Sequence, residues 1–164
     1  MKYRTLGAVG VLALALTACG GGDDAQASES ISQAIRDSES QDMALTQQQA
    51  DCIGDGFVEE IGTDQLVEYG IITEDLKASG GIEDVEMSEG DAGSAADVMA
   101  ECADIKALFT GAMSELPEEA QTCVDENLTD EVLHDFLVSI FMNDQQGGQQ
   151  ELMGALQECL TPGG

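Results

Sequence analysis

The side chains of this 164-residue chain that could do covalent or metal chemistry are five cysteines and one histidine. None of the cysteines stands in a Cys-x-x-Cys pair, the spacing used for thiol redox catalysis. A zinc site needs about four Cys or His ligands at close spacing, which these residues do not supply. The thiols therefore predict structural roles and no metal site. The residues are Cys19, Cys52, Cys102, Cys123, His134 and Cys159.

The sequence contains no motif for a serine nucleophile, a phosphate loop or a dinucleotide site. His134 lies off the apolar face of its expected helix, and a solvated helix histidine is favoured over a general base. Asp51 and Asp55 resemble the start of a calcium loop, but Ile53 and Gly62 stand where oxygen ligands are needed. We predict no enzyme, no catalytic residue and no cofactor.

A positively charged N-terminus and a short apolar run precede Leu16-Thr17-Ala18-Cys19. The run is too short to span a bilayer and has the length of a secretory signal core. Together these features resemble the signal of bacterial lipoproteins, which are cut before a cysteine that then receives lipid. The resemblance implies removal of residues 1–18, a lipid anchor on Cys19, and a location on the extracytoplasmic side of the cell membrane. The alternative is an ordinary secretory signal with an incidental cysteine.

The chain is strongly acidic, with 33 Asp and Glu against 5 Lys and Arg. Removal of residues 1–18 takes away Lys2 and Arg4 and leaves three basic residues against 33 acidic ones, a formal charge of −30. Such a charge repels nucleic acid and anionic lipid headgroups, so we predict no nucleic-acid partner. It favours a basic envelope protein or cations. The acidic segment 83–91 is interpreted as a solvated loop, with loose cation binding as the alternative.

The organisation that we expect is a tether followed by one helical domain. Residues 19–41 are assigned to the lipidated cysteine and a flexible tether, because Gly20 to Ser30 has no apolar residue larger than Ala; a short helix near 30–38 is the alternative. About ten flexible residues reach some 15–20 Å on average. Residues 42–164 form an acidic all-helical domain. Apolar periodicity and cap residues predict helices near 46–61, 64–69, 73–78, 94–113, 117–128, 130–142 and 152–160, with loops at 79–93 and 143–148.

Two parts of this domain are alike. Leu45–Ile53 matches Leu116–Val124, with one cysteine at the same place in each, and Met99–Cys102 matches Leu156–Cys159. We interpret 42–113 and 114–160 as two similar helical units; chance similarity of amphipathic helices is the alternative. This layout resembles small secreted proteins of actinobacteria with paired Cys-bearing helical units, which implies an architecture and no function.

The four cysteines after Cys19 allow three disulfide connectivities. If the two units are equivalent, each closes on itself, which predicts Cys52–Cys102 and Cys123–Cys159. The rival pair Cys102–Cys123 fits poorly, because its members lie at different distances from the expected turn near Glu115. Free buried thiols are the remaining alternative.

The sequence thus predicts an all-α protein, a small bundle of two disulfide-closed helical units behind a signal peptide and a tether. The predicted function is that of a membrane-anchored lipoprotein with a non-catalytic acidic domain, used for interaction or envelope structure. The alternative is a small-ligand or cation-binding lipoprotein for sensing or transport.

Overall fold

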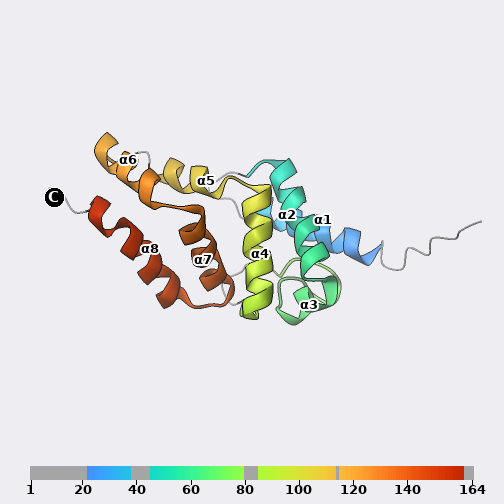
Figure 1. Ribbon diagram of the computed structural model, residues 1–164. Helices are drawn as coiled ribbons and strands as arrows, with labels where there is room; N and C mark the ends of the chain where they lie inside the picture. The colour runs from blue at the N-terminus through green and yellow to red at the C-terminus, as the bar shows by residue number, and fades with distance from the viewer. Residues whose placement is uncertain (1–21, 38–44, 80–84, 114, 161–164) are drawn as a thin grey trace, which may run out of the picture.

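The computed structural model describes residues 22–37, 45–79, 85–113 and 115–160, and this part of the chain is helical (Figure 1). Its only extended pairing is a single antiparallel bridge between Ile72 and Ala78. The all-helical fold class is therefore confirmed. The helices are α1 (Asp23–Asp37), α2 (Gln47–Glu60), α3 (Thr63–Glu68), α4 (Glu89–Cys102), α5 (Ile105–Ala112), α6 (Glu118–Asn127), α7 (Asp130–Phe141) and α8 (Gln145–Leu160).

The helices form a chain of neighbours in space. Helix α1 packs along α2, α2 packs on α4, α4 on α7, and α7 on α8, while α6 returns to α8. Figure 1 shows α1 to α3 at one end of the molecule, α6 and α8 at the other, and α4 between them. The start of α1 and the end of α8 consequently lie at opposite ends.

Helix α2 begins where the sequence predicts. The backbone N–H of Gln49 donates to Thr46 Oγ1 at 3.3 Å, and the Thr46 N–H donates to Gln49 Oε1 at 2.9 Å. This reciprocal capping box satisfies two amide groups that the first turn leaves without partners. Helix α7 follows the cap Thr129, which accepts from the Val132 N–H at 3.3 Å; the sequence leaves Thr129 and Asp130 as candidates for this cap.

The core is built mainly from aliphatic side chains, because aromatic residues make up only 4% of the chain. Ile53, Leu66, Ile72 and Leu128 are almost completely buried. The Phe57 ring meets the edge of the Phe141 ring at a centroid distance of 6.0 Å and so joins α2 to α7. Among the described helices, none is long and apolar enough to cross a membrane.

Much of the expected tether is helix α1, so that expectation needs correction. Ala27 and Ile31 of α1 are buried in the core, and Ser28 and Ser32 are buried beside them. The Ser28 hydroxyl donates to Asp55 of α2, and the Ser32 hydroxyl donates to Asp51. Helix α1 is thus a packed part of the domain. Cys19 and residues 38–41 of the same interval lie outside the described residues.

Two glycines let α2 approach a neighbour on each side. A methyl group added at Gly54 would lie 2.5 Å from the carbonyl oxygen of Ser28 on α1. One added at Gly56 would lie 2.5 Å from a methyl carbon of Val98 on α4. Both positions therefore require glycine, because a Cβ atom would clash with the neighbouring helix. Glycine is kept there although it lowers helix propensity.

Replacing Gly54 with alanine should destabilise the domain, because the obstacle is backbone of α1 and the whole helix must shift. We expect a loss of about 1–3 kcal/mol in the free energy of unfolding, despite a propensity gain of about 1 kcal/mol. Gly154→Ala is the matched control: on α8 nothing lies within 4 Å of the added carbon, so this change should stabilise. Urea denaturation measures both. Equal stabilisation by the two variants would contradict the close approach of α1 and α2.

The single long helix expected over 94–113 is two helices. Helix α4 starts earlier, at Glu89 behind the cap Ser88, and ends at Cys102. Ala103 is extended with φ −139° and ψ 147°, and Asp104 then caps α5 by accepting from the Ala107 N–H at 2.8 Å. Because of this break, the apolar residues of the expected stripe are divided between two helices, α4 and α5.

Three shorter expectations are also wrong. Residues 73–78 form a turn closed by the Ile72–Ala78 bridge, with Leu76 at a φ of +56°. The loop expected over 79–93 contributes Val85 and Met87 to the core before α4 begins, and its residues 80–84 lie outside the described part. Helix α8 begins at Gln145, inside the loop expected at 143–148.

Candidate interaction surface and disulfides

The four described cysteines form two disulfides. Cys52 of α2 is joined to Cys102 of α4 with a Cα–Cα distance of 5.6 Å, and Cys123 of α6 to Cys159 of α8 with 5.5 Å. Both distances are usual for disulfides. These are the two pairs predicted from the equivalence of the two units, and the rival Cys102–Cys123 pair is not formed. The predicted lipidation residue, Cys19, lies outside the described residues.

The acidic residues in the described part of the domain lie at its surface. The only buried polar side chains in the described part are Ser28 and Ser32, so every described Asp and Glu keeps contact with solvent. Between described residues, one pair joins a carboxylate to Lys or Arg: Lys106 Nζ is 3.3 Å from Asp125 Oδ1 and also donates to the Asp125 carbonyl at 2.7 Å. The remaining surface carboxylates are therefore largely without neutralising cations.

His134 on α7 lies between two carboxylates. Its Nε2 is 3.3 Å from Asp97 Oδ1 on α4, and its Nδ1 is 3.3 Å from Asp135 Oδ1. The side chain is 35% exposed, so the expected solvated histidine is in fact a half-buried contact between helices. It links α4 to α7, the contact where the two ends of the molecule meet.

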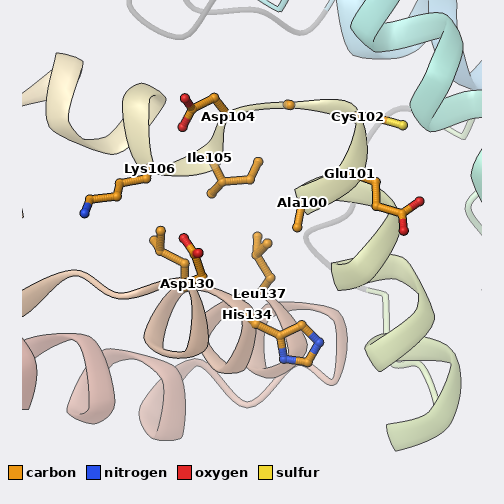
Figure 2. Close-up of a pocket in the computed structure, with 11 residues that line it drawn as sticks. Ala100, Glu101, Cys102, Asp104, Ile105, Lys106, Asp130, His134 and Leu137 are labelled. Atoms are coloured by element: carbon orange, nitrogen blue, oxygen red, sulfur yellow. The ribbon is translucent and has the colours of Figure 1, made fainter.

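A cleft of about 480 Å³ lies between the α4–α5 junction and α7 (Figure 2). In Figure 2 Ile105 and Leu137 face each other across it, while the Lys106 ammonium points away toward its partner on α6. Its lining mixes apolar side chains with ionisable ones. Such a slot could accept an apolar group that carries a positive charge. Its lining includes Ala100, Glu101, Asp104, Ile105, Asp130, Leu133, His134 and Leu137.

A second cavity, of about 770 Å³, lies at the other end of the molecule. It is bordered by the first turn of α1, the Gly62–Gln65 segment that leads into α3, and the turn at Glu74–Leu76. Four carboxylates line it, from Asp23, Asp24, Asp64 and Glu74. This cavity is not predicted from the sequence, because the first turn of α1 was assigned to the tether.

The acidic segment 83–91 differs from the solvated loop that we expected. Glu83 and Asp84 lie outside the described residues, while Glu89 and Asp91 belong to the first turn of α4. Asp91 accepts from the Tyr69 hydroxyl at 2.5 Å and from the Ser88 hydroxyl at 2.9 Å. Its carboxylate thus holds the start of α4. Within the described part of the chain, no cluster of three His, Cys, Asp or Glu is placed to hold a metal ion.

Comparisons with protein-family models, with curated proteins and with solved structures gave no significant match to this chain.

Proposed function

We propose that this protein is an extracytoplasmic lipoprotein, held to the cell membrane by lipid on Cys19, whose non-catalytic acidic domain binds a basic protein of the envelope. The observation that carries the proposal is the placement of charge. The carboxylates are spread over the surface, and in the described part only Asp125 is paired with a lysine or arginine.

Unpaired surface charge acts at a distance and raises the rate at which an oppositely charged partner arrives. A formal charge of −28 in the full sequence is far more than solubility requires of one small domain. The same charge repels nucleic acid and anionic lipid, which leaves basic proteins and cations as partners. The domain is proposed to act as a displayed binding surface.

We also propose that residues 42–113 and 114–160 are two related helical units. In each unit the disulfide joins the helix that carries the first cysteine to the helix that carries the last, α2 to α4 and α6 to α8. This shared pattern supports the relation that the sequence similarity suggests.

Lipid attachment predicts that Cys19→Ala abolishes membrane retention. The variant should move from the membrane fraction to the soluble fraction or accumulate as unprocessed precursor, because it has no thiol to lipidate. Fractionation with detection of the domain measures this. The double variant with Cys52 and Cys102 both changed to alanine, which removes two cysteines of the folded domain and leaves no free thiol there, is the control and should stay in the membrane fraction. Normal processing and retention of the Cys19→Ala variant would disprove the anchor.

Electrostatic binding predicts that partners captured from envelope extract are basic and are lost as salt rises. Raising ionic strength from about 0.05 to 0.5 M shortens the Debye length severalfold, so surface attraction should weaken strongly. Quantitative pull-down at both salt concentrations measures the effect. The same pull-down with Glu118, Glu119 and Glu126 of α6 changed to Gln should recover less partner at low salt. Partners retained equally at both concentrations would contradict the proposal.

The alternative function is binding of a small ligand, and the 480 Å³ cleft between α4, α5 and α7 favours it. A ligand with an apolar body and a positive end fits the lining. A thermal-shift screen of organic amines tests this alternative. A shift of several degrees that Leu137→Ala removes, without any salt-sensitive protein partner, would support the ligand-binding function over the interaction function.

A further inference from the structure

Helix α1 is fixed in direction by contacts along its length. Near its start, the Thr63 hydroxyl donates to Asp24 Oδ1 at 2.7 Å, and Gln26 Nε2 donates to the Asp75 carbonyl at 3.2 Å. Further along, Ala27 and the helix's two buried serines pack against α2. The first turn of α1 therefore cannot move away from the domain without breaking these contacts.

The anchor position is close to this first turn. Asp23 follows Cys19 by four positions in the sequence. A chain extends by at most about 3.6 Å per residue, so the Cα atoms of Cys19 and Asp23 lie within about 14 Å of each other. Among the described elements, α1 is the packed part of the domain nearest to Cys19 along the chain.

We propose that the domain faces the membrane with one defined end, and that the lipid headgroup layer is the partner of that end. This membrane-facing end consists of the first turn of α1, Gly62–Gln65 and Glu74–Leu76. The inference rests on the proposed lipid attachment at Cys19. Since α6 and the end of α8 lie at the opposite end of the molecule (Figure 1), they are held farthest from the bilayer.

Charge does not create this orientation, because the membrane-facing end carries the carboxylates of Asp23, Asp24, Asp64 and Glu74. These groups are repelled by anionic headgroups. The covalent link nevertheless keeps them within reach, and salt screens the repulsion over about 8 Å at physiological ionic strength. The membrane-facing end should therefore lie close to zwitterionic lipid. At low salt it should move away from anionic lipid as far as the residues between Cys19 and α1 allow.

Photo-crosslinking to lipid tests the orientation in the full, lipidated protein reconstituted into zwitterionic vesicles. A photoreactive side chain is placed at Asp64 of the membrane-facing end or, as the matched acidic control, at Glu126 of α6; both positions are exposed. We expect lipid adducts at Asp64 to exceed those at Glu126 at least fivefold. A ten-residue Gly-Ser insert immediately before Gly22 should reduce the Asp64 adducts severalfold, while membrane retention and the thermal unfolding midpoint remain unchanged.

Equal adducts at the two positions, or Asp64 adducts that the insert does not change, would overturn the orientation while leaving the lipid anchor intact. Retention of the Cys19→Ala variant in the membrane fraction would instead disprove the anchor, and the orientation would fail with it. Adducts confined to Glu126 would show that the opposite end faces the bilayer and would also overturn the proposal.

Discussion

Replacing both Cys52 and Cys102 with alanine should lower the free energy of unfolding by about 4 kcal/mol, according to the chain-entropy model for loops of this length. The two cysteines are 50 positions apart, and the loop that they close contains α3 and most of α2 and α4. Cys52 is exposed and Cys102 is only half-buried, so alanine at both positions leaves little cavity and the effect comes mainly from the freed chain. Total stabilities of about 5–15 kcal/mol are usual, so the variant should be marginally stable. Urea denaturation of the two proteins measures the difference.

The comparison needs the double variant, because a single substitution leaves a thiol that can react with Cys123 or Cys159. A reductant provides the control: it should lower the unfolding midpoint of the parent protein more than that of the double variant, which has one disulfide fewer. Identical unfolding curves for parent and double variant would contradict the prediction.

Replacing Cys123 and Cys159 with alanine should release α6 locally. In the described structure Val124 is the only residue of α6 that is buried, whereas α2 buries Ala50, Ile53, Gly54 and Phe57. Little besides the disulfide therefore holds α6 to α8. The chain-entropy model again gives about 4 kcal/mol, which corresponds to a decrease of up to about 1,000-fold in the protection of α6 amides from hydrogen exchange.

Helices α2 and α4 supply the internal control in the same exchange experiment, because neither contains a residue of this disulfide. Their amides should keep their protection. If α2 and α4 lost as much protection as α6, the disulfide would be stabilising the whole domain, and the assignment of a local role would be wrong.

The sequence predicted the helices whose buried faces consist of large apolar residues. In α7, Leu133, Leu137 and Phe141 recur at helical spacing, and all three are buried. It also predicted the disulfide partners, because each cysteine has a counterpart at the matching place of the other unit. Both signals are local, or repeat along the chain, and need no knowledge of tertiary contacts.

The sequence predicted only the second half of α1, as the alternative of a short helix near 30–38, because the buried face of the first half consists of small residues. Ala27, Ser28 and Ser32 carry little apolar surface, and they are buried because α2 approaches closely at Gly54. That approach joins residues far apart in the chain, so apolar periodicity cannot show it. The cleft lined by Ile105 and Leu137 also depends on contacts between residues far apart in the chain, so apolar periodicity does not predict it either.

The break between α4 and α5 is marked in the sequence by a helix-cap residue, but the continuous apolar stripe around it predicts a single helix. Asp104 has the side chain of a helix cap, and it accepts from the amide three residues later. The apolar stripe continues on both sides of it, from Val98 to Leu108, so a count of apolar positions favours one helix. The cap at Asp104 nevertheless starts a new helix within the continuous stripe.

The arrangement of the disulfides also determines how the molecule bears mechanical load. One disulfide joins α2 to α4 and the other joins α6 to α8, so neither crosses the contact between α4 and α7. A force applied between the start of α1 and the distal helices passes through that contact. It is held by packing, by the His134–Asp97 pair, and by the Met87 N–H donating to the Phe141 carbonyl at 2.9 Å. Under tension the contact between α4 and α7 should separate first. The two disulfide-crosslinked halves, α1–α4 and α5–α8, would then be joined only by the extended backbone at Ala103.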